Sequence, residues 1–350
     1  SSRSWKEAMI HPTRRRPVPA PSGERLEDPF GRRLDYLRLS VTDRCNLRCR
    51  YCMPASGVAK VGHDDVLRIE EMLELCSILV DLGVRKVRLT GGEPLVRRGV
   101  LDLLRGLGEL PIPPTLAVTT NGVLIEAKLD ALLAAGVDRV NLSLDSLRPE
   151  TFARVTRRDD FDRVRRGLDL LLASPLDLKI NVVVLPGTND HEFGDFVDLV
   201  RDHDVTVRFI EPMAFDGDGG RDATSMDGDT IVDRLRTHVD LRALGRGPHD
   251  VAETWESDAL RGRLGVIRAH TRAFCADCNR LRLDARGRLR TCLYGTPSAD
   301  LGAILRSGGH PDTVRGAIAE AITRRHADGY VAEATRCRTT TNESMSSIGG

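Results

Sequence analysis

The sequence predicts an α/β fold built around a parallel β-sheet, and two observations lead to this prediction. Apolar runs typical of buried strands recur between residues 37 and 210, and amphipathic helical patterns separate them. Such an alternation gives parallel strands joined by right-handed helical crossovers. Polar or cysteine-rich residues follow these strands, as they do at the C-terminal ends of the strands in barrel enzymes.

Six strands are predicted, at residues 37–41, 86–89, 115–119, 139–144, 179–185 and 206–210. The helices between them are predicted at 69–80, 126–135, 161–173 and 191–202. Gly83 and Gly136 occupy positions where helix C-caps are expected. Cys76 belongs to the apolar stripe of the first helix, so we predict a core thiol there. Periodicity does not decide whether the sheet closes, because a doubly wound sheet has the same pattern. However, the first strand is followed by a cysteine loop and not by a G-x-G-x-x-G turn.

Three regions are expected along the chain. Residues 1–33 are rich in arginine and proline and are predicted to be a flexible extension. Residues 34–214 hold the strand–helix units. In residues 215–350 the pattern loosens, and we expect a helix at 230–239, strands at 264–270, 280–283 and 289–291, and a helix at 312–326.

The charge balance is neutral, with 52 lysines and arginines against 51 acids, so no overall field favours nucleic acid or a membrane surface. No run approaches 18 consecutive apolar residues, and the first residues lack the apolar core of a secretory signal. We therefore expect a cytoplasmic protein that binds neither nucleic acid nor membrane.

Three cysteines follow the first predicted strand with the spacing C-x3-C-x2-C, at Cys45, Cys49 and Cys52. Thiolates select soft metals, and three of them on one loop can hold three corners of a cuboidal iron–sulfur cluster. A zinc loop and a set of core thiols are the alternatives. A zinc site normally takes four protein ligands, and core thiols rarely cluster so tightly.

A second group contains Cys275, Cys278 and Cys292, which also indicate a metal site. The alternative here is a zinc knuckle with His270 as the fourth ligand. Strand alternation places Arg280 and Arg282 on one face beside this group. Paired guanidinium groups suit an anion such as phosphate, whereas a solvated strand face is the plainer interpretation.

Other polar motifs end the remaining strands. Residues 90–94 read TGGEP, residues 119–122 read TTNG, residues 143–146 read SLDS, and residues 211–213 read EPM. Each motif alone predicts only a turn or a satisfied core residue. Together they gain meaning, because the C-terminal ends of parallel strands meet at one end of a barrel.

The first cysteine spacing and the GGEP motif resemble those of radical S-adenosylmethionine (SAM) enzymes. With KINVVV at 179–184, CADCNRLRL at 275–283 and the final Gly-Gly, the motifs from about residue 30 onward resemble the GTP 3′,8-cyclase family of molybdenum cofactor biosynthesis. The resemblance implies an incomplete six-stranded (β/α) TIM-like barrel whose open side is closed by a C-terminal extension. It also implies radical SAM lyase chemistry. A 5′-deoxyadenosyl radical abstracts the ribose 3′ hydrogen of GTP, and 3′,8-cyclo-7,8-dihydro-GTP is formed.

The family motifs assign roles to particular residues. They imply two [4Fe-4S] clusters, one on Cys45, Cys49 and Cys52 that binds SAM, and one on Cys275, Cys278 and Cys292 that faces the substrate. The implied SAM contacts are Tyr51, Gly92, Ser143 and Met213. The implied GTP contacts are Arg38, Arg88, Thr119, Lys179, Arg280 and Arg282. The two arginines last named are also implied in catalysis, together with Gly349 and Gly350 of the tail.

The resemblance further implies a flavodoxin- or ferredoxin-like electron donor and transfer of the product to cyclic pyranopterin monophosphate synthase. It leaves a monomer or a homodimer open. Two other functions compete with this one. The nearer is a radical SAM enzyme with an auxiliary cluster that modifies a peptide, and the other is a non-catalytic iron–sulfur or zinc protein.

Overall fold

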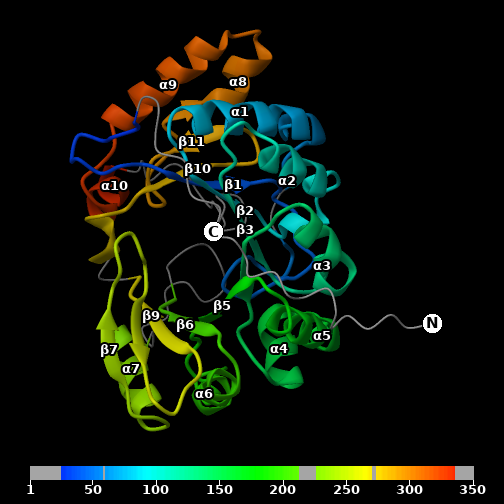
Figure 1. The fold of residues 1–350 in the computed structure, drawn as a ribbon, viewed down its shortest axis with the longest axis vertical. Coiled ribbons are helices and arrows are strands. Elements are labelled where there is room, and N and C mark those ends of the chain that lie inside the picture. The colour runs from blue at the N-terminus through cyan, green and yellow to red at the C-terminus, as the bar shows by residue number, and fades with distance from the viewer. Residues whose placement is uncertain (1–24, 58–59, 213–225, 270–272, 336–350) are drawn as a thin grey trace.

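A curved, mostly parallel sheet with helices on its outer face forms the fold (Figure 1). The computed structural model describes residues 25–57, 60–212, 226–269 and 273–335. Within these residues the strand order is β12-β11-β10-β1-β2-β3-β4-β5-β6-β9-β8-β7. The sheet is open, because β12 and β7 are its two edge strands. The predicted partial barrel is therefore confirmed.

The six central strands are those that the sequence predicts. They are β1 (Tyr36–Ser40), β2 (Lys86–Thr90), β3 (Thr115–Thr120), β4 (Arg139–Ser143), β5 (Asp177–Val183) and β6 (Thr206–Ile210). Each pairs in parallel with the next along the chain. The helices that connect them are α1 (Ile69–Asp81), α2 (Val100–Gly108), α3 (Ile125–Ala134), α4 (Pro149–Thr156), α5 (Phe161–Leu172) and α6 (Phe193–Asp202).

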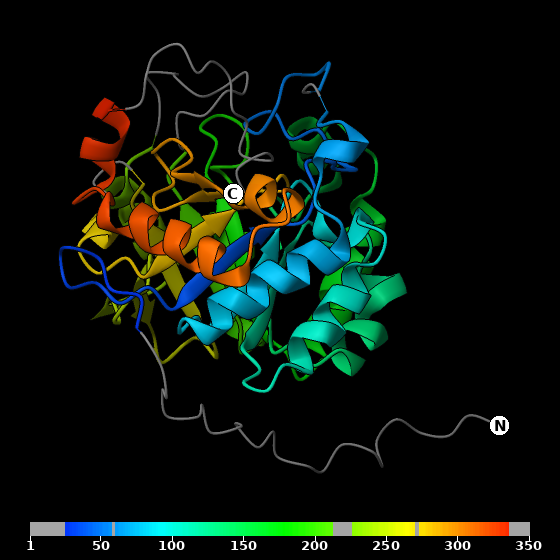
Figure 2. The ribbon, with the colours of Figure 1, turned by 90° about the horizontal axis from the view of Figure 1, so that it is seen from above.

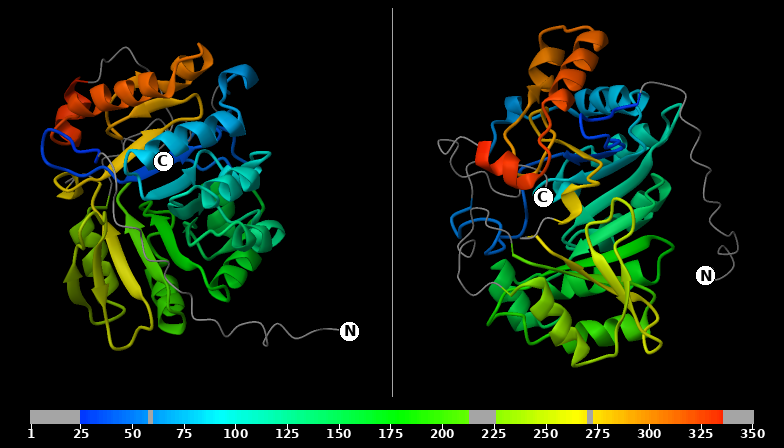
Figure 3. Two further views of the ribbon diagram at one scale, coloured as in Figure 1. Left: turned by 45° about the horizontal axis from the view of Figure 1, so that its top comes forward. Right: turned by 90° about the vertical axis from the view of Figure 1, so that its left-hand side faces the viewer.

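The C-terminal region lengthens the barrel wall at both ends. β9 (Arg263–Ile267) pairs in parallel with β6, and β10 (Arg280–Leu283) pairs in parallel with β1. Short antiparallel strands follow on each side, namely β7 (Arg242–Gly245) and β8 (Glu253–Glu256) beyond β9, and β11 (Arg288–Arg290) and β12 (Ala299–Asp300) beyond β10. Figure 3 shows β7 to β9 beside the central strands. The open side thus lies between two walls from the same C-terminal region.

The remaining helices belong to the C-terminal region. They are α7 (Gly228–Arg236), α8 (Leu301–Arg306), α9 (Pro311–Thr323) and α10 (Gly329–Thr335). α8 and α9 pack beside α1 on the outside of the sheet (Figures 1 and 2). None of the helices in the described residues is long and apolar enough to cross a membrane.

Alternation along β1 separates the core from the barrel interior. Leu37 and Leu39 are fully buried in the core cluster beneath the helices. Tyr36 and Arg38, the alternate residues, line the interior cavity. The same core contains Cys76, as its place in the helical stripe predicts.

Residues 25–33, the C-terminal part of the predicted extension, belong to the folded unit. A bridge joins Glu27 to Arg33, and Asp28 and Arg32 are buried. The rest of the predicted extension, residues 1–24, lies outside the described residues.

Candidate active site

A cavity of about 540 Å³ occupies the barrel interior. It extends from the first cysteine loop, beyond the C-terminal end of β1, to residues at the starts of other strands, among them Lys86, Arg139 and Asp177. Residues from β9 and β10 also line it, so both walls built by the C-terminal region contribute to the site.

Cys45, Cys49 and Cys52 line the cavity from one loop. The backbone N–H groups of Arg48 and Arg50 donate to carbonyls at the end of α4, at 3.0 Å each, which holds the loop against the barrel. Burial raises the pKa of each of the three thiols, because a lone thiolate is poorly solvated there.

These thiols suit a cationic metal group that stabilises their ionised form. Among the described residues no three His, Cys, Asp or Glu side chains converge closely enough to hold one metal ion. Three cysteines on one loop are a ligand set that a cuboidal iron–sulfur cluster takes, with one thiolate on each of three irons.

Two glycines let the end of β2 cross directly against the chain that leads into this loop. A Cβ at Gly91 would lie 2.3 Å from the Thr42 carbonyl oxygen, and a Cβ at Gly92 would lie 2.4 Å from that of Arg44. The close approach allows two hydrogen bonds of 2.8 Å, from the N–H of Gly92 to Thr42 and from that of Glu93 to Arg44. Both glycines line the cavity beside the cysteines.

Glu93 connects the ends of β2 and β3 to the first cysteine loop, a role that the sequence motifs did not indicate. Its buried carboxylate accepts hydrogen bonds from the Leu95 N–H, the Thr120 hydroxyl and the Asn121 N–H, at 2.7–3.0 Å. Asn121 in turn donates its side-chain amide to Asn46 at 2.8 Å and to the Cys45 sulfur at 3.8 Å. Burial raises the pKa of Glu93 to about 7, although these donors lower it. The TTNG turn is thereby joined to the cysteine loop.

Asp145 performs a similar function at the ends of β4 and β5. It accepts the hydroxyl of Tyr51 at 2.8 Å and the N–H of Val183 at 2.8 Å. Burial raises the pKa of Asp145 to about 6, against the effect of these two donors. Tyr51 and Ser143, both implied in SAM binding, line the cavity together with Asp145.

The strand register places the cationic residues in two rows. Tyr36 of β1 is aligned with Lys86 of β2 and Arg280 of β10. Two residues further along β1, Arg38 is aligned with Arg88 and Arg282. Period-two alternation directs both rows to the same face. Four of the predicted GTP contacts, Arg38, Arg88, Arg280 and Arg282, are therefore adjacent although they come from distant parts of the chain.

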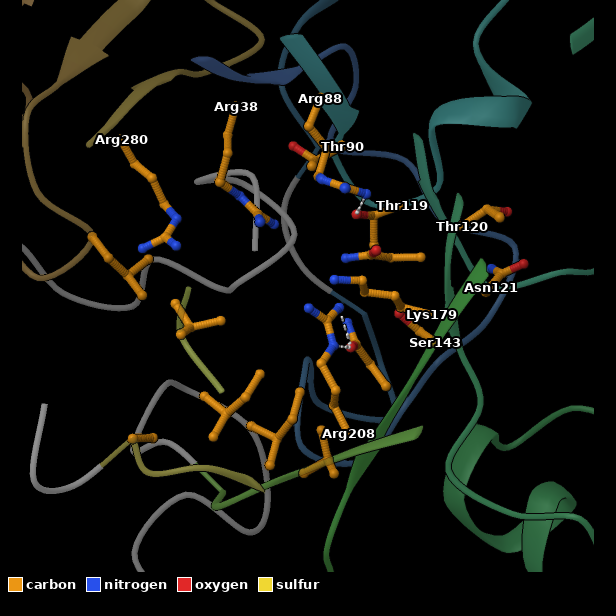
Figure 4. Close-up of a pocket in the computed structure, with 18 of the residues that line it drawn as sticks. Arg38, Arg88, Thr90, Thr119, Thr120, Asn121, Ser143, Lys179, Arg208 and Arg280 are labelled. Atoms are coloured by element: carbon orange, nitrogen blue, oxygen red, sulfur yellow. Dashed lines mark hydrogen bonds between the residues drawn. The ribbon is translucent and has the colours of Figure 1, made fainter. Parts of the chain in front are cut away.

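The cavity receives further polar groups from its other strands. Lys179 of β5 and Arg208 of β6 point toward the same space as Arg38 and Arg280 (Figure 4). Arg208 donates from Nε and Nη2 to the Asn181 side chain at 2.9 and 2.6 Å. Arg88 donates to the Thr119 hydroxyl at 3.4 Å. Arg208 was missed from the sequence, although its central position in a predicted strand was a usable signal.

Tyr36 lies among these cations and was also missed. Its hydroxyl accepts a hydrogen bond from Arg88 Nε at 2.7 Å, and the Lys86 ammonium lies 4.5 Å from its ring centroid. Burial alone would raise the pKa of Tyr36, but the charges of Arg88, Arg38, Lys86 and Arg280 outweigh it and lower the pKa to about 6. Burial, with the nearby charge of Arg88, likewise lowers the pKa of Lys86 to about 8.

The second cysteine group lines a smaller cavity of about 50 Å³. Cys275, Cys278 and Cys292 all border it, together with Arg280 and Arg282, which also line the large cavity. Burial opposes ionisation of Cys278, yet the charges of Arg280 and Arg325 lower its pKa overall. Arg280 donates to the Cys278 sulfur at 3.8 Å. The second cysteine group is thus placed next to the cationic rows.

Several predicted residues lie outside the described part of the chain. They are Met213, His270, Gly349 and Gly350, as well as Cys337. The structure places every other site residue that the sequence predicts on the wall of one of the two cavities.

Comparisons with known proteins agree with this arrangement. Residues 39–200 match the Radical SAM superfamily, and residues 205–331 match the family described as Molybdenum Cofactor Synthesis C. The chain is 37% identical to a GTP 3′,8-cyclase of Alkaliphilus oremlandii, over 93% of this chain and 100% of that protein. It is 40% identical to a GTP 3′,8-cyclase of Chlorobaculum tepidum, over 93% of this chain and 97% of the relative.

A relative from Drosophila melanogaster, molybdenum cofactor biosynthesis protein 1, is 39% identical over 87% of this chain and 54% of its own length. Among solved structures, Streptococcus suis SuiB bound to S-adenosylmethionine aligns with a TM-score of 0.58 at 14% identity, over 78% of this chain and 65% of SuiB. This last likeness concerns the fold alone, and the chain spans less than two thirds of SuiB. The near-complete alignments with the two bacterial relatives are the ones that decide the family, and by them this chain belongs to the GTP 3′,8-cyclase family of radical SAM proteins.

Proposed function

We propose that this protein is a GTP 3′,8-cyclase and catalyses the radical SAM cyclisation of GTP in the first step of molybdenum cofactor biosynthesis. One observation carries the proposal beyond family membership. Two aligned rows of cationic side chains lie in one cavity between two groups of three cysteines. The cysteines suit electron-transfer metal groups, and the cations suit a polyanionic substrate.

The first cysteine group would hold a [4Fe-4S] cluster, and Tyr51, Gly92, Ser143 and Met213 would contact SAM. When bound there and supplied with an electron by the external donor, the cluster and SAM would provide the radical chemistry that removes the ribose 3′ hydrogen and so allows C3′ to bond to guanine C8. The chain itself orients the loop through Glu93 and Asn121 and orients Tyr51 through Asp145. It also encloses the reacting groups within the barrel, which limits quenching by water.

The cationic rows would bind the triphosphate. Arg88 and Arg282 are less than a tenth exposed, and a polyanion bound beside them would offset part of the cost of burying charges of one sign. The planar guanidinium fork matches phosphate oxygens in pairs, which favours Arg38, Arg280 and Arg282 as the principal contacts. Thr119 beside Arg88, together with Lys179 of β5 and Arg208 of β6, would complete the site.

The second cysteine group would hold another [4Fe-4S] cluster. With three protein ligands, such a cluster would have one iron available to bind the guanine base. Because Arg280 borders both cavities and donates to Cys278, triphosphate and base would be held on either side of the same residue. This would direct the ribose between them toward SAM.

The family resemblance suggests the partners. A flavodoxin- or ferredoxin-like protein would deliver the electrons, and cyclic pyranopterin monophosphate synthase would take the product. The proposed working form is a cytoplasmic monomer or homodimer.

The decisive experiment is an anaerobic reaction of the reconstituted protein with reductant, SAM and GTP. We expect 5′-deoxyadenosine and a cyclised GTP product by mass spectrometry. When ATP replaces GTP, neither product should rise above its level in a reaction without nucleotide. A protein that modifies a peptide would instead bind no GTP by calorimetry and give no cyclised nucleotide, and this result would refute the proposal.

The Gly-Gly tail gives a separate prediction. Deleting Gly349 and Gly350 should abolish cyclisation while SAM binding persists, because the family motif implies that the slender tail enters the active site. Equilibrium binding of SAM and product formation should be measured on the same preparation. Unchanged cyclisation would contradict the predicted role of the tail.

Binding of GTP should weaken as the pH rises from about 7 to about 9. A bound polyanion favours the protonated forms of Tyr36 and Lys86, whose pKa values are lowered to about 6 and about 8 in the free protein. Binding therefore takes up protons, and affinity falls by up to about tenfold per pH unit for each proton taken up. Calorimetry in buffers of different ionisation enthalpy measures this uptake directly. A binding enthalpy that is the same in all buffers would contradict it, and Lys86→Met should reduce the uptake.

A further inference from the structure

A buried ionic group lies directly behind the second cysteine group. Asp28 accepts a hydrogen bond from Arg32 Nε at 2.6 Å, and Arg325 Nε lies 3.4 Å from the same carboxylate oxygen, Oδ2. The side chain of Asp28 is 0% exposed, and those of Arg32 and Arg325 are 6% and 3% exposed. Two guanidinium groups therefore share one carboxylate, which leaves a net positive charge in the interior.

These arginines also hold the cysteine turn. Arg32 Nη1 donates to the carbonyl of Cys275 at 2.9 Å, and Arg325 Nη2 donates to the carbonyl of Cys278 at 2.8 Å. Arg32 further donates to the carbonyls of His326 and Ala327, so it ties the cysteine turn to the chain that follows α9. The positions of both cysteines thus depend on residues near the two ends of the described chain.

One donor of this group remains unused. Arg325 Nη1 is buried and has no hydrogen-bond partner among residues 25–57, 60–212, 226–269 and 273–335. Arg325 lines the small cavity together with all three cysteines. Among the described residues that line this cavity, the one acid is Asp328, and its carboxylate accepts the N–H groups of Tyr330 and Val331 at 2.8 and 2.9 Å. A buried donor without a partner costs free energy unless an acceptor arrives with the ligand.

We propose that Arg325 is the charge partner of the metal group held by Cys275, Cys278 and Cys292, toward which it donates its unused N–H and whose reduction potential it raises. This inference rests on the proposed second cluster. A [4Fe-4S] core with three thiolate ligands is an anion, and reduction makes it more negative. A buried cation beside it stabilises the reduced form more than the oxidised form, because net charge and hydrogen bonds to sulfur set such potentials.

The charge of Arg325 also explains the arrangement around it. Arg32 and Arg325 both line the small cavity, and the carboxylate of Asp28 offsets one of their two charges, so one positive charge in excess is left beside the cysteines. Arg280 and Arg282 border the same cavity from the substrate side. The cluster would therefore lie between the arginines proposed to bind GTP and the Asp28–Arg32–Arg325 group, in which Arg325 has the unused donor.

The test compares Arg325→Gln, Arg325→Lys and the neighbouring Arg324→Gln. Arg324 is a matched control because its side chain is 69% exposed and pairs with Glu320. Each change is made in the full chain with Cys45, Cys49 and Cys52 replaced by alanine, so that only the second cluster forms. Iron content is measured after anaerobic reconstitution, and the midpoint potential is measured by electron paramagnetic resonance during redox titration.

We expect a lower midpoint potential in Arg325→Gln and values near the parent in Arg325→Lys and Arg324→Gln. A parental potential in Arg325→Gln, or an equal shift in Arg325→Lys, would overturn the inference. If Arg325→Gln does not retain its iron, retention by Arg325→Lys supports the charge role, and loss from both variants refutes it. Absence of iron in the parent with the three alanines would instead refute the second cluster itself, which separates the two failures.

Discussion

Replacing Gly92 with alanine is expected to remove most of the iron from the first cysteine group and to lower the free energy of unfolding by about 1–3 kcal/mol, the usual range for overpacking. The new methyl group would lie 2.4 Å from the Arg44 carbonyl oxygen and 2.6 Å from its carbon. Both atoms belong to the backbone, so no side-chain rotation relieves the clash. The chain leading into Cys45 must therefore move.

That movement would break specific interactions. The hydrogen bonds from the N–H of Gly92 to Thr42 and from the N–H of Glu93 to Arg44 are both 2.8 Å long. A shift of Glu93 would also disturb its bond to the Asn121 N–H and, through Asn121, the contacts with Asn46 and Cys45. Iron retention and SAM binding should fail together, because one loop provides for both.

Gly316→Ala is the matched control for this experiment. Gly316 lies inside α9, and a Cβ there would meet no atom within 4 Å. Alanine in a helix interior is favoured over glycine by up to about 1 kcal/mol, so this variant should be neutral or slightly more stable. Thermal unfolding, iron content and equilibrium SAM binding are compared between the two variants. A Gly92→Ala protein with full iron and normal SAM affinity would contradict the close-approach argument.

The sequence predicted the central barrel well because each strand is bounded by a local signal. Apolar runs marked the buried faces, and turn motifs marked the strand ends, so all six predicted central strands were found within a few residues. α2 and α4 were missed. α2 contains two glycines, which weaken a helical pattern, and α4 is a single short helix within a polar connection.

The assembly of the site depended on register, which local patterns do not encode. Nothing in the sequence near residue 280 indicates that β10 pairs with β1, yet this pairing aligns Arg280 with Tyr36 and Arg282 with Arg38. The same applies to Asp28 and Arg325, which are almost three hundred residues apart and meet only in the folded chain. The family motifs predicted Arg38, Arg88, Arg280 and Arg282. The positions of Tyr36, Arg208 and Arg325 beside the site became evident only in the structure.

Arg280→Ala should abolish cyclisation and weaken GTP binding by roughly 2–5 kcal/mol, or about 30-fold to several thousand-fold, which is the cost of truncating one partner of a desolvated charge pair. Arg280 is the residue on which the two cavities converge. Its Nη2 donates to the His249 carbonyl at 2.8 Å, its Nη1 donates to the Cys278 sulfur, and its guanidinium carbon lies 5.7 Å from the Tyr36 ring centroid. These contacts fix the guanidinium before substrate arrives, so binding loses little side-chain entropy.

The Arg280→Ala experiment must separate loss of the phosphate contact from loss of the cluster. Iron content and SAM binding are therefore measured beside GTP calorimetry, and both should match the parent, because all six cysteines of the two groups are unchanged. Arg263→Ala, an exposed position on β9, is the control for removing an arginine from the same sheet. Lysine at position 280 should recover only part of the affinity, since a single ammonium cannot form the paired bonds of a guanidinium.

Normal GTP affinity and turnover in Arg280→Ala would remove the phosphate role from this residue. Position 280 would then serve the second cysteine group alone, and the triphosphate would have to bind along Arg38, Arg88 and Lys179.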